Sequence, residues 1–148
     1  REHYDGVITM DSDGQHDPAE IPQLIRAGEL QHAGIVLGNR MTDGSSMPKA
    51  RRRTNALMST IVSVIARQQI PDSQCGFRLI RKEVLEDLPL RSRRYEVETE
   101  LLLKAASRRW KIVSVPVRSI YGDHLSHIRP VREGVRFVGI VLRYLLRR

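Results

Sequence analysis

Hydrophobic residues are distributed along this chain in two patterns, short apolar runs and longer segments with helical spacing. Strands are predicted at residues 4–11, 33–40, 77–80 and 110–122. Helices are predicted at residues 20–30, 54–69, just after residue 80, in the segment 91–109, and at 129–148. The basic segment 45–53 is predicted to be a loop. Short apolar strands alternating with helices predict an α/β domain with a parallel sheet.

The first predicted strand ends in VITMDSDGQHDP, a cluster of polar residues of the kinds that bind metals. Asp11 and Asp13 point the same way if the strand geometry persists, because side chains alternate along a strand. Ligands of parallel α/β sheets bind beyond the carboxyl ends of strands. Two carboxylates there can hold Mg²⁺ or Mn²⁺, although a solvated turn would also place them there. Asp17 is interpreted as a helix N-cap, with Pro18 at the first helical position, and His16 as a residue packing near this loop.

Length and composition exclude several classes of protein. The 148 residues, 41% of them hydrophobic, can form one domain with a core. No apolar run reaches the roughly 20 residues that a membrane span needs. Cys75 is the only cysteine, so it cannot form an internal disulfide, which fits a reducing compartment. We expect a cytoplasmic location, either free or at the inner face of the membrane.

The charge balance predicts an anionic partner. The net charge is +8, and only four of the 25 basic residues are lysines. Arginine presents a fork of donors suited to phosphate, although a genome that favours arginine codons would give the same excess. Nucleic acid is a poor candidate, because aromatic residues make up only 5% and no helix-turn-helix or zinc spacing is present.

Five short motifs follow one another along nearly the whole chain. They are DSDGQHDP (11–18), GNR (38–40), DSQCGFR (72–78), YEVETELLLKAASRRWKIVSVPV (95–117) and SHI (126–128). This set resembles the family-two glycosyltransferases of the GT-A fold, in particular the subgroup of dolichyl-phosphate mannose synthases and related polyprenyl-phosphate sugar transferases. The resemblance implies a mixed α/β sheet flanked by helices, and transfer of a sugar from a nucleotide-diphosphate-sugar donor to a polyprenyl phosphate or a cell-envelope glycan precursor.

The resemblance also implies roles for individual residues. Asp11, Asp13 and Gln15 would bind Mg²⁺ or Mn²⁺ in the manner of a DXD motif. Asp72 is the first candidate on the acceptor side and Glu98 the second, each as the base that a hydroxyl acceptor would need. The residues expected to bind donor or acceptor phosphates are Arg40, Arg51, Arg52, Ser126, His127 and Arg129. Arg51 and Arg52 could equally belong to a solvated loop.

One part of the family pattern is missing from this sequence. Family members open with a strand and turn carrying Pro-x-Tyr-Asn-Glu, and no such segment occurs here. We therefore expect residues 1–148 to be the C-terminal part of a single catalytic domain, without the first nucleotide-binding strands, and inactive alone. The alternative is a non-catalytic relative, a basic module that binds phosphate or a membrane surface.

The predicted terminal helix, within residues 130–148, is basic and amphipathic. On a helical wheel Arg132, Arg136, Arg143 and Arg147 fall within an arc of about 60°. Apolar residues cover most of the remaining surface. Such a helix can lie in an anionic membrane interface, or it can be a core helix with one solvated edge.

Overall fold

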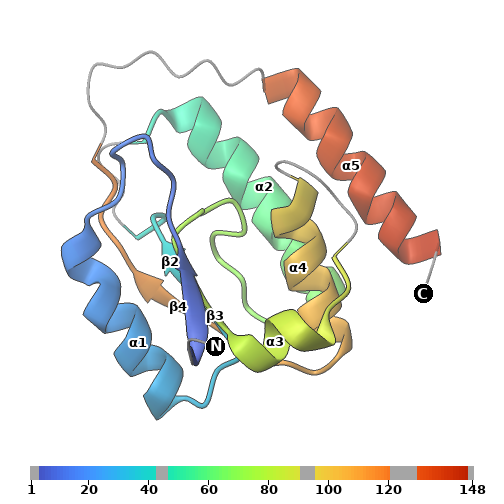
Figure 1. Cartoon of the computed structure of the whole chain (residues 1–148). Coiled ribbons are helices and arrows are strands. Elements are labelled where there is room, and N and C mark those ends of the chain that lie inside the picture. Colours follow the sequence, from blue (N-terminus) through green and yellow to red (C-terminus); the bar gives the residue numbers. More distant parts are fainter. Residues whose placement is uncertain (1–3, 43–46, 91–95, 121–129, 147–148) are drawn as a thin grey trace.

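The computed structural model describes residues 4–42, 47–90, 96–120 and 130–146 as a four-stranded sheet flanked by helices (Figure 1). The strand order is β1-β3-β2-β4. The strands are β1 (Gly6–Thr9), β3 (Arg78–Arg81), β2 (Ile35–Asn39) and β4 (Ile112–Pro116). Strands β2 and β4 are parallel, whereas β3 is antiparallel to both β1 and β2. The mixed α/β sheet implied by the resemblance is confirmed and is consistent with a GT-A-like fold.

The expectation of a fully parallel sheet is wrong for β3. The chain leaves the helix α2 (Lys49–Ala66) and runs back beside it before β3 begins. Two helix hydroxyls hold this return segment: Ser63 Oγ accepts from Ile70 N at 3.0 Å, and Ser59 Oγ accepts from Ser73 N at 2.9 Å. The chain therefore enters β3 at the carboxyl end of β2 and has to run antiparallel to it.

Strand β2 lies between two hydrophobic clusters. All five of its residues are buried. Ile35 and Leu37 face the cluster built with α2 and the later helices, whereas Val36 faces the cluster built with helix α1 (Ile21–Leu30). Figure 1 shows α1 on one side of the sheet and α2, α4 and α5 on the other. Burial on both faces explains why this strand is a continuous apolar run in the sequence.

The predicted helix start at Asp17 is confirmed. Asp17 accepts from Ala19 N at 2.9 Å and caps a short 3-10 turn, η1 (Pro18–Glu20). Helix α1 follows directly, with Pro22 in its first turn. The side chain of Leu24 is completely buried against the sheet.

Helix α2 is longer than predicted. It begins at Lys49, immediately after Pro48, so Arg51 and Arg52 lie in its first turns rather than in a loop. Proline suits the boundary of a helix because it has no N–H to contribute. The buried residues Met58 and Val62 anchor the middle of the helix to the core, whereas its added first turn is exposed or half-buried.

The remaining helices complete the larger hydrophobic cluster. They are α3 (Lys82–Asp87), α4 (Glu96–Ser107) and α5 (Pro130–Leu146). Trp110 packs at the start of β4, as predicted, and its Nε1 donates to Asp87 at 2.8 Å. Phe137 and Ile140 of α5 are buried. Within the described part of the chain, no helix combines the length and hydrophobicity needed to cross a bilayer.

Candidate functional site

The two carboxylates predicted to bind metal lie in the loop that follows β1. Asp11 and Asp13 are both exposed, and the Asp11 side chain is 47% exposed. Asp13 Oδ1 accepts from Gln15 N at 3.0 Å, and Gly14 adopts a φ of 75° between them. The carbonyl of Gln15 accepts from Ile120 N at 3.0 Å. The loop is therefore held against the segment that leaves the carboxyl end of β4.

Asp11 rests directly on the backbone of the segment before β3. A Cβ atom at Gly76 would overlap both carboxylate oxygens of Asp11. Thr9 Oγ1 donates to Gly76 O at 2.9 Å, which ties this segment to the end of β1. A side chain at position 76 would displace the Asp11 carboxylate, because the carboxylate fills the space of that side chain.

His16 lies on the buried side of Asp11. Its side chain is 1% exposed, and its Nε2 is 3.7 Å from Asp11 Oδ2. The imidazole packs on Phe77 with ring centroids 5.3 Å apart. In the described part of the chain neither ring nitrogen has a hydrogen-bond partner. A buried polar group without a partner is uncommon in native proteins.

Arg40 and Asp72 form a buried ion pair. Arg40 Nε and Nη2 donate to the two oxygens of Asp72 at 2.8 and 3.0 Å, and Arg40 N adds a third bond at 3.1 Å. The side chains are 2% and 0% exposed. Both oxygens of Asp72 are therefore occupied, and an acceptor could reach Asp72 or Arg40 only if this pair opened.

Glu98 lies closer to solvent and pairs with a second buried arginine. Arg78 Nη2 is 3.3 Å from Glu98 Oε2, and Arg78 also donates to the carbonyls of Ser73 and Cys75. The Glu98 side chain is 27% exposed. Burial raises the pKa of Glu98 above its usual range, Arg78 lowers it, and the charge of Asp11 raises it further. Glu98 and Asp11 therefore belong to one electrostatic cluster.

The pKa of Asp11 is shifted in the opposite direction. Interaction with the His16 imidazole lowers the pKa of Asp11, and this is the largest effect. Burial opposes it, and the charges of Arg40 and Arg78 lower the pKa further. Asp11 is therefore held ionised at the surface, in the state that a cation requires.

The other predicted phosphate ligands fall into two groups. Arg51 and Arg52 are half-buried, and Arg52 Nη2 donates to Met41 O at 3.0 Å, just past the end of β2. The structure thus brings these arginines to the same edge of the sheet as Arg40. Ser126, His127 and Arg129 lie outside the described residues.

Asp11, Asp13 and Gln15 carry the kinds of oxygen ligand that a magnesium-type cation prefers. The described residues contain no group of three or more His, Cys, Asp or Glu side chains placed to hold a metal ion. Two carboxylates and an amide oxygen nevertheless match Mg²⁺, which keeps several waters and is usually bound through one or two carboxylates plus substrate phosphates. The position of Asp11 against Gly76, with an unpartnered imidazole behind it, fits such a site.

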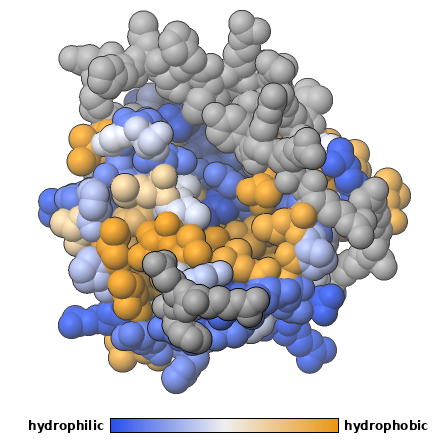
Figure 2. Space-filling view, viewed as in Figure 1, coloured by the Kyte–Doolittle hydropathy of each residue, from blue (hydrophilic) through white to orange (hydrophobic). Residues whose placement is uncertain are grey.

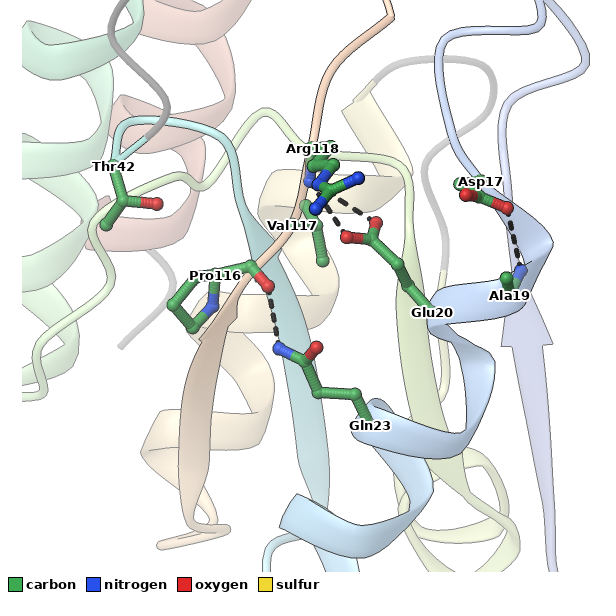
Figure 3. Close-up of a pocket in the computed structure, with 8 residues that line it drawn as sticks. All are labelled: Asp17, Ala19, Glu20, Gln23, Thr42, Pro116, Val117 and Arg118. Carbon is green, nitrogen blue, oxygen red and sulfur yellow. Dashed lines mark hydrogen bonds between the residues drawn. The ribbon is translucent and has the colours of Figure 1, made fainter.

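A pocket that the sequence did not predict lies beside this loop (Figure 3). Its volume is about 520 Å³. Glu20 accepts from Arg118 N at 3.1 Å, and Gln23 Nε2 donates to Pro116 O at 2.7 Å. No local signal could have revealed these contacts, because the partners are 98 and 93 residues apart. The lining residues are Asp17, Ala19, Glu20, Gln23, Thr42, Pro116, Val117 and Arg118.

Comparison with known proteins gives a consistent result. Residues 4–89 match glycosyl transferase family 2. A UDP-N-acetylglucosamine–dolichyl-phosphate N-acetylglucosaminyltransferase of Methanococcus voltae is 31% identical over 125 residues, which cover 81% of this chain and 50% of that protein. An undecaprenyl-phosphate mannosyltransferase of Micrococcus luteus is 28% identical over 120 residues, 77% of this chain and 49% of that protein. A polyprenol monophosphomannose synthase of Mycolicibacterium smegmatis is 28% identical over 123 residues, 79% of this chain and 46% of that protein.

The chain thus spans about half the length of the curated relatives that it matches. The family match covers more than half of this chain and includes β1, the Asp11–Asp13 loop and the Gly76 segment. The chain therefore belongs to glycosyl transferase family 2, as its motifs predicted.

Proposed function

We propose that the protein transfers a sugar from a nucleotide-diphosphate-sugar donor to a polyprenyl-phosphate acceptor, with a divalent cation bound by Asp11, Asp13 and Gln15. The observation that carries this proposal is the ionised, half-exposed Asp11 at the carboxyl end of β1, beside Asp13. The relatives support the acceptor class, because their names specify dolichyl phosphate, undecaprenyl phosphate and polyprenol.

The chemistry depends on charge. A divalent cation, when bound, would neutralise the charge that develops on the diphosphate leaving group. The residues of this chain keep the Asp11 carboxylate ionised and determine where it lies. His16 lowers the pKa of Asp11 most, the charges of Arg40 and Arg78 lower it further, and Gly76 lets its carboxylate lie against the backbone. A lipid phosphate is already ionised near neutral pH and needs no strong base.

A saccharide acceptor is the second candidate, and Glu98 is the observation that favours it. A sugar hydroxyl must lose a proton during transfer, so a carboxylate base must lie within reach. Glu98 has a raised pKa, is partly exposed and lies in the same cluster as Asp11. Asp72 fits this role less well in the described state, because Arg40 occupies both of its oxygens.

The metal proposal is tested by Asp13→Asn in the full-length protein. This variant should lose sugar transfer and show weaker Mn²⁺-dependent binding of nucleoside diphosphates, while its circular dichroism stays that of the wild type. Asp17→Asn is the matched control, because it lies in the same loop and Asn caps a helix about as well as Asp. Transfer at the wild-type rate by Asp13→Asn, or by the wild type in excess chelator, would refute the metal-dependent mechanism.

The acceptor proposal is tested by Glu98→Gln with two acceptors. Transfer to a polyprenyl phosphate should survive this change, because that acceptor needs no base. Transfer to a saccharide hydroxyl should fall by a factor of about 10² or more if Glu98 is the base. An enzyme that uses only saccharides would disprove the lipid-phosphate acceptor.

A further inference from the structure

His16 is a buried polar side chain of the site whose effect on Asp11 the proposed function has not yet explained. Its imidazole is almost completely enclosed, yet in the described part of the chain both nitrogens lack hydrogen-bond partners. A neutral imidazole carries one donor and one acceptor. Burying both without partners is unfavourable, so the position calls for an explanation.

The nearest polar atom given for this imidazole is the Asp11 carboxylate. Nε2 lies 3.7 Å from Asp11 Oδ2, which is longer than the usual 2.7–3.2 Å of an N–H···O bond. A small rotation of the carboxylate would close this gap. Hydrogen bonds at active sites are often long in the free protein and tighten when ligand binds.

Asp11 lies against Gly76 and His16, and Phe77 packs on the His16 ring; we call these three residues the Asp11 seat. The carboxylate fills the space where a Gly76 side chain would be. Phe77 is fully buried and packs at a tilt against the His16 ring, so the imidazole has little room to move away. The seat therefore restricts the positions that the Asp11 oxygens can occupy.

Exposure decides on which side of Asp11 a cation would bind. The Asp11 side chain is half-exposed, whereas His16 is enclosed behind it. A cation arriving from solvent meets the carboxylate first and cannot reach the imidazole without displacing it. His16 is therefore placed to act on the cation through Asp11 and not as a ligand itself.

We propose that His16 is a positioning residue, which donates from Nε2 to Asp11 Oδ2 and thereby orients this carboxylate for a divalent cation. The inference rests on the proposed function, since it assumes that Asp11 binds the cation. Hydrogen bonds to metal-ligating groups commonly fix the orientation and basicity of the ligand. Gly76 bounds the same carboxylate.

The test is Mn²⁺ binding to the full-length protein, followed by the electron paramagnetic resonance signal of free Mn²⁺. His16→Leu removes the donor and should raise the dissociation constant about 10–100-fold, the range typical of such supporting partners. His16→Gln keeps an N–H donor and should restore most of the affinity. Gly76→Ala should also weaken binding, because its Cβ displaces Asp11, whereas Gly139→Ala, where a Cβ meets nothing within 4 Å, should not.

The outcomes separate this inference from the proposed function. If Asp11→Asn binds Mn²⁺ like the wild type, the metal site itself is wrong. If Asp11→Asn loses binding but His16→Leu retains it, only the role of His16 is wrong. If His16→Leu weakens binding and His16→Gln does not restore it, His16 is merely a packing residue and the inference fails.

A measurement on the wild type covers the case in which His16→Leu does not fold. The ¹⁵N resonance of His16 Nε2 should shift on addition of Mg²⁺, as its hydrogen bond to Asp11 shortens. The proposal would be overturned if this resonance stays unchanged in the wild type at saturating Mg²⁺ while the separate variant Asp11→Asn no longer binds Mg²⁺.

Discussion

At the scale of single residues, two buried arginines organise the site. Arg40 pairs with Asp72 and Arg78 pairs with Glu98; both arginines add to the effect of His16 in lowering the pKa of Asp11. Burial of Cys75 in the same segment raises its pKa to about 12, so the thiol is a packed, unreactive group. Arg40, Asp72 and Glu98, which the sequence predicted as separate site residues, thus belong to one electrostatic cluster with Asp11.

Breaking the Arg40–Asp72 pair should cost much more than breaking an exposed pair. Asp72→Asn leaves the Arg40 charge buried without its partner, so the free energy of unfolding should fall by about 3–5 kcal/mol. Arg108→Gln is the control, because its pair with Asp87 is at the surface and Arg108 is 59% exposed. That control should cost about 1 kcal/mol or less.

Urea denaturation of both variants measures this difference. Comparable losses for the buried and the exposed pair would contradict the enclosed position of Asp72. Full transferase activity in a folded Asp72→Asn variant would also exclude Asp72 as the base for an acceptor.

Glu98 should make the stability of the protein depend on pH in a direction set by its raised pKa. A carboxyl whose pKa is raised on folding stabilises the native state below its unfolded pKa, and this contribution is lost as the pH rises through the folded pKa. Glu98→Gln does not titrate. The variant should therefore gain stability relative to the wild type as the pH rises above 4.5, the ordinary value for Glu98.

Urea denaturation of Glu98→Gln and of the wild type, at a series of pH values from below 4.5 upward, tests whether the variant gains relative stability as the pH rises. Asp11→Asn gives the opposite trend, because the pKa of Asp11 is lowered and its contribution is lost as the pH falls. A stability difference between Glu98→Gln and wild type that stays constant with pH would show that folding does not raise the pKa of Glu98.

At the scale of secondary-structure elements, β1 is the most exposed part of the sheet. Among the described residues it pairs with β3 alone. Tyr4, Val7 and Met10, on or beside this strand, are exposed. Figure 2 shows hydrophobic surface on the face where β1 lies in front. A strand with a free edge and apolar neighbours is a template for pairing with another chain.

A protein limited to residues 1–148 should therefore self-associate through β1. Val7→Lys should reduce association, because a charge on an edge strand opposes edge-to-edge pairing. Val138→Lys is the matched control, since it replaces an exposed valine on α5, away from this edge. Light scattering after size exclusion gives the mass, and a monodisperse wild-type monomer would contradict the expectation.

At the scale of the whole molecule, α5 presents apolar residues on two faces. Phe137, Ile140 and Val141 are buried against the larger cluster, so the helix is part of the core. Val138, Leu142, Leu145 and Leu146 are exposed on the other side. Arg143 is exposed too, whereas the side chains of Arg132 and Arg136, and the whole of Arg147, lie outside the described residues.

An exposed apolar face beside cationic residues predicts binding to anionic membranes. The full-length protein should sediment with anionic vesicles at low salt and be released at high salt, because basic residues near the surface each add about 1 kcal/mol. Replacing Arg132, Arg136, Arg143 and Arg147 with glutamine should reduce sedimentation strongly. Neutral vesicles are the control, and wild type that stays in the supernatant at low salt would exclude this surface.

Local patterns in the sequence determined most of the elements of this fold. The four strands, the helices and the Asp17 cap were predicted, because side-chain spacing along one element and the chemistry of a helix end are local properties. The order of five motifs indicated the family, and the family match confirmed it. The predicted start of α2 was wrong, because the basic segment after Pro48 was taken for a loop although it continues the helix.

Only the tertiary structure decided how the candidate residues are combined. Arg40 meets Asp72 across 32 residues, and Thr9 meets Gly76 across 67, contacts that no local spacing encodes. The antiparallel direction of β3 likewise depends on Ser59 and Ser63 of α2 holding the return segment. Sequence could identify Asp11 as a carboxylate suited to a cation, but Gly76 and His16 became its neighbours only through packing. The physical reason is that partners distant in the chain are selected by the shared core, which forms only when the whole domain folds.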